Sequence, residues 1–170
     1  MALFFGVGAT NLFAQLEQRS FEVAPDQKYA VIWNDSELTG APTRIITAFR
    51  FNPREIIFSR ITFPRWTGAA WNGASSRLAL FDDPDNGNSF LWIISKGSST
   101  WKNTKIDVLD RLETLFPVND PTKLARGGID SMHWSSNDEL NCDVTYENRQ
   151  FDLMVNIHRG TPFVQIREKK

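Results

Sequence analysis

Two stretches of the chain repeat one pattern about sixty residues apart. Residues 70–95 read AWNGASSRLALFDDPDNGNSFLWIIS, and residues 133–157 read HWSSNDELNCDVTYENRQFDLMVNI. In the alignment, Trp71 falls on Trp134, Arg77–Phe81 on Glu139–Asp143, and Phe90–Ile94 on Phe151–Val155. Each copy predicts a strand, a tight polar turn, a returning strand, and a third strand that closes the unit after a loop. The chain is therefore expected to fold as successive β units.

The turns and strands of these copies have clear local signals. Asn86-Gly87, within the run Asp83–Gly87, is a strong hairpin signal because both residues accept the positive φ of two-residue turns. The stretch 151–157 alternates apolar with polar residues, as a sheet with one solvated face does. By contrast, 90–94 is apolar throughout, which predicts a strand covered on both faces.

A fainter third copy precedes the other two, at Phe21–Trp33, with the turn Ala24-Pro25-Asp26-Gln27. Together the copies resemble the repeats of β-propeller proteins of the TolB and WD40-like class, which carry a Trp-Ser-Pro-Asp-Gly-like turn and a Leu-Ala-Phe-like strand. The matching residues are Trp71-Asn72-Gly73, Leu78–Phe81 and Leu91–Ile94, with Trp134–Asp138 in the last copy and Ala24–Val31 in the first. The resemblance covers about half the chain and implies blade-like units.

Closed propellers need about four to eight blades, and this chain holds at most three copies. Either it assembles with copies of itself, or it forms an open curved sheet, and we favour the open sheet. The segment 104–116 predicts one amphipathic helix, because Ile106, Leu109 and Leu112 recur at helical spacing and Pro117 ends the pattern. The fold class is therefore mainly β: antiparallel sheets built from two to three propeller-like units, with this helix packed on the sheet.

The N-terminal segment, residues 1–15, differs from the rest of the chain. Ala2–Ala14 is apolar and uncharged, has the length of a signal-peptide core, and is too short to span a bilayer as a helix. It predicts export to a secreted or periplasmic location. It lacks a basic start, so the alternative is that the segment is retained as a strand or helix packed on the domain, and the protein is then cytoplasmic. Residues 16–170 are expected to form a single β-rich domain.

Composition narrows the function classes. The net charge is −1 with both signs mixed along the chain, so no basic patch indicates nucleic-acid binding. The single Cys142 cannot form an internal disulfide or a thiolate metal site. No transmembrane span and no cofactor are expected. Thirteen Phe and six Trp are many for this length, and flat side chains suit pleated surfaces and interfaces.

Candidate reactive residues are few. His133 and His158 are expected to be exposed polar residues on a sheet edge, because two imidazoles are too few ligands for a typical transition-metal site. The carboxylates Asp82, Asp83 and Asp85 form a weak calcium candidate whose spacing departs from the EF-hand pattern. No serine lies in a nucleophile elbow. The sequence thus predicts no catalytic residue and no firm metal site.

Binding is the better expectation. Trp66 and Trp101, with Arg65 and Lys102 beside them, lie in loop-like polar surroundings, and exposed Trp and Arg are favoured at interfaces. We therefore expect a non-enzymatic protein-interaction or accessory module. It is expected to bind a protein partner or to associate with copies of itself. Two alternatives stay open: a hydrolase that uses the Asp82–Asp85 loop near His133, and a structural subunit of a larger assembly.

Overall fold

The fold was analysed in a computed structural model, which describes residues 19–38, 41–62, 66–85, 88–118, 127–158 and 160–170. It is mainly β, with three antiparallel four-stranded sheets and one short helix. Sheet A comprises β1 (Arg19–Val23), β2 (Tyr29–Leu38), β3 (Ala41–Arg50) and β4 (Glu55–Thr62). Sheet B comprises β5 (Trp66–Trp71), β6 (Arg77–Asp85), β7 (Asn88–Lys96) and β8 (Trp101–Asp107). Sheet C comprises β9 (Gly127–Trp134), β10 (Glu139–Tyr146), β11 (Arg149–His158) and β12 (Thr161–Glu168).

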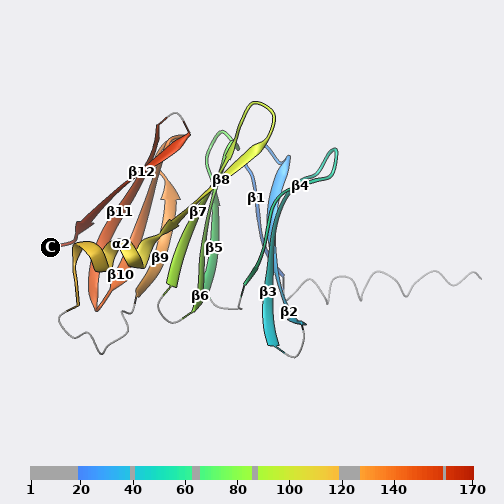
Figure 1. The fold of residues 1–170 in the computed structure, drawn as a ribbon. Helices are drawn as coiled ribbons and strands as arrows, with labels where there is room; N and C mark the ends of the chain where they lie inside the picture. The colour runs from blue at the N-terminus through green and yellow to red at the C-terminus, as the bar shows by residue number, and fades with distance from the viewer. Residues whose placement is uncertain (1–18, 39–40, 63–65, 86–87, 119–126, 159) are drawn as a thin grey trace, which may run out of the picture.

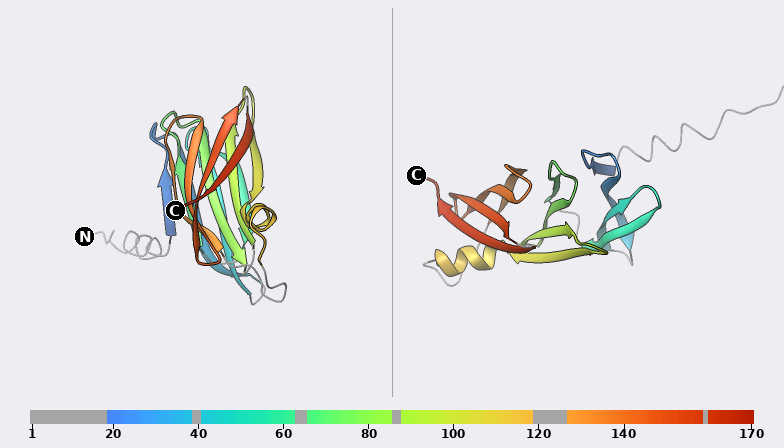
Figure 2. Two further views of the ribbon diagram at one scale, coloured as in Figure 1. Left: turned by 90° about the vertical axis from the view of Figure 1, so that its left-hand side faces the viewer. Right: turned by 90° about the horizontal axis from the view of Figure 1, so that it is seen from above.

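The sheets stack face to face with sheet B in the middle (Figures 1 and 2). In each sheet the strands follow one another in chain order, and every neighbouring pair is antiparallel. The repeat predicted from the sequence is confirmed, since Trp71 ends β5 and Trp134 ends β9, the equivalent first strands of their sheets. Each unit has four strands instead of the three expected, because β4, β8 and β12 each close a sheet.

Two apolar cores hold the stack together, one on each face of sheet B. Leu78 and Ile94 face sheet A, where they pack with Val31 and Ile46. The alternate residues of the same strands, among them Leu91, face sheet C. The sequence 90–94 was predicted to be covered on both faces, and this is confirmed. The alternation in 151–157 is also confirmed, because Phe151, Leu153, Val155 and Ile157 are buried and the residues between them are not.

The helix α2 spans Val108–Leu115, and its N-cap is Asp107, whose side chain accepts a hydrogen bond from the amide of Asp110. Val108, Leu109 and Leu112 are buried in the core shared by sheets B and C. The helix therefore packs on the sheet as expected. It begins four residues later than the predicted start at 104, because residues 101–107 pair with β7 as β8.

Equivalent turns, which lie at the same end of the strands in each sheet, link the three sheets along one side of the stack. In the turns after β1 and β5, Ala24 and Asn72 donate their amides to the carbonyls of Tyr29 and Arg77, and Gln27 and Ser75 adopt positive φ. The amide of Asp26 then donates to Ser75 Oγ at 2.9 Å, and the amide of Ala74 donates to Asn137 Oδ1 at 3.1 Å. We call this chain of contacts from sheet A to sheet C the turn ladder.

Candidate functional site

Two of the four predicted binding residues, Trp101 and Lys102, have side chains that the structure describes, and these lie on opposite faces of sheet B. Trp101 begins β8 and is half-buried, with its ring centroid 5.2 Å from Tyr29 and 6.2 Å from Trp71. It therefore covers the end of the core between sheets A and B, which the loop-like sequence around it did not indicate. Lys102 is exposed and, as the next residue of the strand, points to the other face of sheet B. Trp66 begins β5, and its side chain and Arg65 lie outside the described residues.

Asp82 serves as a buried link between sheets. Its side chain is 1% exposed and accepts from Arg60 Nε at 2.6 Å and from Thr62 Oγ1 at 3.0 Å. Both donors come from β4, so Asp82 faces sheet A. The side chains of the other two calcium candidates, Asp83 and Asp85, lie outside the described residues. Among the described residues, no three His, Cys, Asp or Glu side chains lie close enough together to hold a metal ion.

The two histidines do not meet. His133 on β9 pairs through Asn141 with Met154 on β11, and His158 lies four residues further along that strand. Strand geometry places them about 13 Å apart along the strands and about 10 Å apart across them. His133 points to the outer face of sheet C, whereas Asp82 faces sheet A. The structure therefore does not bring His133 and Asp82 together.

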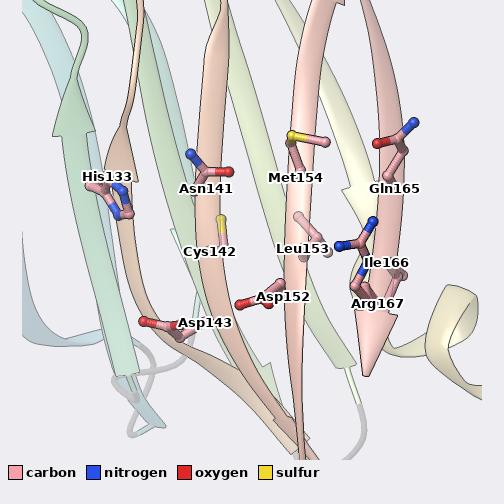
Figure 3. Close-up of a pocket in the computed structure, with 10 residues that line it drawn as sticks. All are labelled: His133, Asn141, Cys142, Asp143, Asp152, Leu153, Met154, Gln165, Ile166 and Arg167. Atoms are coloured by element: carbon pink, nitrogen blue, oxygen red, sulfur yellow. The ribbon is translucent and has the colours of Figure 1, made fainter. Parts of the chain in front are cut away.

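A new candidate site emerges on the outer face of sheet C, the face turned away from sheet B (Figure 3). The strand register places its side chains in two rows that cross all four strands. The first row is His133, Asn141, Met154 and Gln165, and the second is Ser131, Asp143, Asp152 and Arg167. All of these residues except Ser131 line a hollow of about 660 Å³.

Lys169 controls the charge of the second row. It follows β12, its Nζ pairs with Asp143, and it lies 3.2 Å from Asp152 Oδ1. Lys169, together with a 2.5 Å hydrogen bond from Ser131 Oγ, holds the pKa of Asp143 below its usual range. The same carboxylates, Asp143 before Asp152, raise the pKa of Lys169. Asp143 is therefore held in its charged form, and Lys169 balances part of the negative charge of this row.

Cys142 lies under this face, on the core side of β10. It is 3% exposed, and burial, with a smaller effect of the Asp143 charge, raises the pKa of its thiol to about 12. Since the thiolate is the nucleophilic form, this cysteine is unreactive at neutral pH. It acts as a small packed residue, as a buried free cysteine usually does.

The chain matches no family model, and no curated protein matches it. The candidate site offers amide, imidazole, carboxylate and guanidinium groups, with Met154 at the centre as an apolar contact. Such a surface suits hydrogen bonding to a polar partner.

Sequence reasoning missed most of this site. Asn141, Asp152, Gln165 and Arg167 look like ordinary polar strand positions. The signal that could have found them is the alternation in 151–157, whose polar positions mark the solvated face of a terminal sheet. Finding the neighbours on β9 and β12 also required the register.

Among the described residues, no helix is long and apolar enough to cross a membrane.

Proposed function

We propose that the protein is an exported, non-enzymatic interaction module that binds a protein partner through the outer face of sheet C. The observation that carries this proposal is the pair of polar rows around the hollow on that face. A terminal sheet that faced only solvent would need no more than scattered charged residues on its outer face. Here eight side chains from four strands share one surface.

The proposed partner presents a polar surface of mixed charge. Asp143 and Asp152 already share the charge of Lys169, so a partner need not supply a positive charge to balance these carboxylates. Among the described residues, Arg167 has no ion pair, and it lies at the outer end of the second row. A carboxylate of the partner that reaches Arg167 can form a bidentate hydrogen bond with its guanidinium.

We also propose that the three sheets are propeller-type blades of the TolB and WD40-like class, arranged as an open array. Support comes from the four-strand meanders and from the contacts of β5 with both β1 and β9, the first strands of their sheets. Export is supported by the apolar sequence Ala2–Ala14, which lies outside the described residues. An interaction module with an open array of blades fits the role of an accessory subunit.

The test begins with a photo-reactive residue at position 165 in the chain, incubated with extract of the native host. A matched probe at the exposed position 111 on α2 is the control. We expect a cross-linked protein that appears only with the probe at 165. Calorimetry with that purified protein should then show binding at least about tenfold weaker for Arg167→Glu and unchanged for Arg111→Glu. Equal cross-linking from both positions, or equal binding by both variants, would contradict the proposal.

A further inference from the structure

The two ends of the stack differ in chemistry. The outer face of sheet A, turned away from sheet B, carries three cross-strand rows. They are Val23, Ala30, Phe49 and Ile56; Phe21, Ile32, Thr47 and Ser59; and Arg19, Asn34, Ile45 and Ile61. Of these twelve residues only Arg19, at the start of the edge strand β1, is of a charged type. At the other end, the rows of sheet C include Asp143, Asp152 and Arg167.

This face is also the main exposed apolar surface of the described residues. Phe21, Ile56 and Ile61 are 63%, 65% and 65% exposed, and Val23 is 38% exposed. Phe51, 47% exposed in the turn after β3, extends the surface through an edge-to-face contact with Phe49, whose ring centroid lies 5.2 Å away. Contiguous apolar patches of this kind on soluble proteins mark interaction sites. Figure 2 shows that no other sheet covers this side of the stack.

The sequence pattern points the same way. Sheet B is apolar on both faces because sheets A and C cover it. In β3, Ile45 and Ile46 are successive apolar residues, and so are Ala48 and Phe49, although only the face with Ile46 and Ala48 is buried. Strands with apolar residues on both faces are typical of covered sheets. Sheet A is therefore built like a middle sheet while lying at an end.

Charge decides which occupant fits. Continuing the stack with sheet C of another copy would bury Asp143, Asp152 and Lys169 against Ile56 and Ile61. These three groups would lose their hydration there, and Arg167, which has no ion pair among the described residues, would be buried as an unpaired charge. The outer face of sheet A is mostly apolar, and the one charged residue in its rows, Arg19, lies on the edge strand β1. It can therefore pack against an identical face without burying a charge at its centre. A two-fold dimer requires a surface of this self-complementary kind.

We propose that two copies of this chain associate through the outer faces of sheet A and form a two-fold symmetric dimer. The dimer is a stack of six sheets in which the solvated faces of sheet C lie at both ends. Strand rise and spacing give a face about 19 Å wide and about 26 Å long, or about 1,000 Å² over both copies, which is at the lower limit of biological interfaces. The two sheet C faces stay open to partners.

The test is the mass of the full 170-residue chain in solution, measured by light scattering and sedimentation velocity at about 1 to 50 µM, a range in which interfaces of this class form. We expect twice the monomer mass of 19.4 kDa. The double variant Ile56→Glu with Ile61→Glu should be a monomer with an unchanged circular-dichroism spectrum. The control Phe163→Glu changes a side chain that is 59% exposed on the outer face of sheet C, and should stay dimeric.

A milder variant covers the risk that two glutamates unfold sheet A. Ile61→Thr keeps a β-branched residue in β4 and should weaken the dimer about tenfold. Three results would overturn the proposal. These are a monomeric full chain, a dimer that Phe163→Glu disrupts, and a full chain that dimerises only after residues 1–14 are removed. The last would mean that this segment occupies the face in the intact chain.

Discussion

Arg60 on β4 places its Nε 2.6 Å from Oδ2 of Asp82 on β6, and this ion pair joins sheet A to sheet B inside the stack. The guanidinium also lies over the ring of Trp92, with its Cζ 5.1 Å from the ring centroid. The carboxylate is almost completely buried, whereas Arg60 keeps 26% of its side chain exposed. A residue in the candidate metal loop is thus explained by packing between sheets.

Removing either partner of this pair should destabilise the protein strongly. Arg60→Ala leaves the carboxylate of Asp82 buried with Thr62 as its remaining side-chain donor, and we expect a loss of about 3 kcal/mol in the free energy of unfolding. Urea titration measures this loss. The exposed pair of Arg50 and Glu55, 2.7 Å apart, is the matched control, and Glu55→Ala should cost less than about 1 kcal/mol. Equal losses would show that Asp82 is not effectively buried.

The turn ladder makes a separate prediction through Asn72, which is 0% exposed. Its Oδ1 accepts from the amides of Ser76 and Arg77, and its Nδ2 donates to the carbonyl of Asn137 in the next turn. Asn72→Ala should lower the free energy of unfolding by about 3 kcal/mol.

Asn72→Asp separates the two roles, because a carboxylate keeps the acceptor within the turn and loses the donor to Asn137. It should cost at least as much as Asn72→Ala, because a buried carboxylate oxygen then faces the carbonyl oxygen of Asn137. The amide of Ala74 should exchange faster with deuterium in both variants. Unchanged exchange at Ala74 would mean that the turns of sheets B and C are not coupled.

Acidification should release the contacts of Lys169. The pKa of Asp143 is lowered in the folded protein, so its contribution to stability is present above the unfolded value of about 3.8 and is lost as pH falls through the lower folded value. Stability should therefore fall more steeply between pH 5 and pH 2 in the natural chain than in Lys169→Met, as urea midpoints at each pH can measure. Lys170→Met is the control with the same change of charge. If both variants behave like the natural chain, Lys169 does not set the charge state of this face.

Cys142 should resist thiol reagents in the folded protein. With a pKa of about 12 and 3% exposure, it offers almost no accessible thiolate at pH 8. Ellman's reagent should modify it only after urea unfolds sheet C. Rapid modification under native conditions would show that β10 does not pack against sheet B as described.

The sequence predicted the repeat well because its signals are local. The equivalence of Trp71 and Trp134 depends on turns whose residues have intrinsic preferences. Likewise, Asp85 pairs with Asn88 across the predicted hairpin at 86–87. The prediction placed residues 104–107 in the helix and Trp101 in a loop because Trp101–Asp107 lacks apolar alternation, whereas pairing with β7 makes the whole segment the strand β8. Its exposure pattern reflects an edge strand, which sequence periodicity does not reveal.

The candidate site could not be derived from sequence alone for a related reason. Which face of a strand is solvated depends on which sheet ends the stack, and this is a property of tertiary packing. Trp101 illustrates the limit: its neighbours in sequence are polar, and its neighbours in space are Tyr29 and Trp71. Conversely, Asp152 and Arg167 are ordinary polar residues in sequence and become one row only through the register of β11 and β12.

The most direct test of the partner surface compares two methionines on opposite faces of sheet C. Met154 lies in the hollow on the outer face, and Met132 packs against the core. Hydroxyl-radical oxidation, followed by mass spectrometry, gives the rate at each sulfur with and without a saturating amount of the partner identified by cross-linking. We predict that the partner slows oxidation of Met154 several-fold and leaves the slow oxidation of Met132 unchanged. An unchanged rate at Met154 would contradict the assignment of this face as the binding surface.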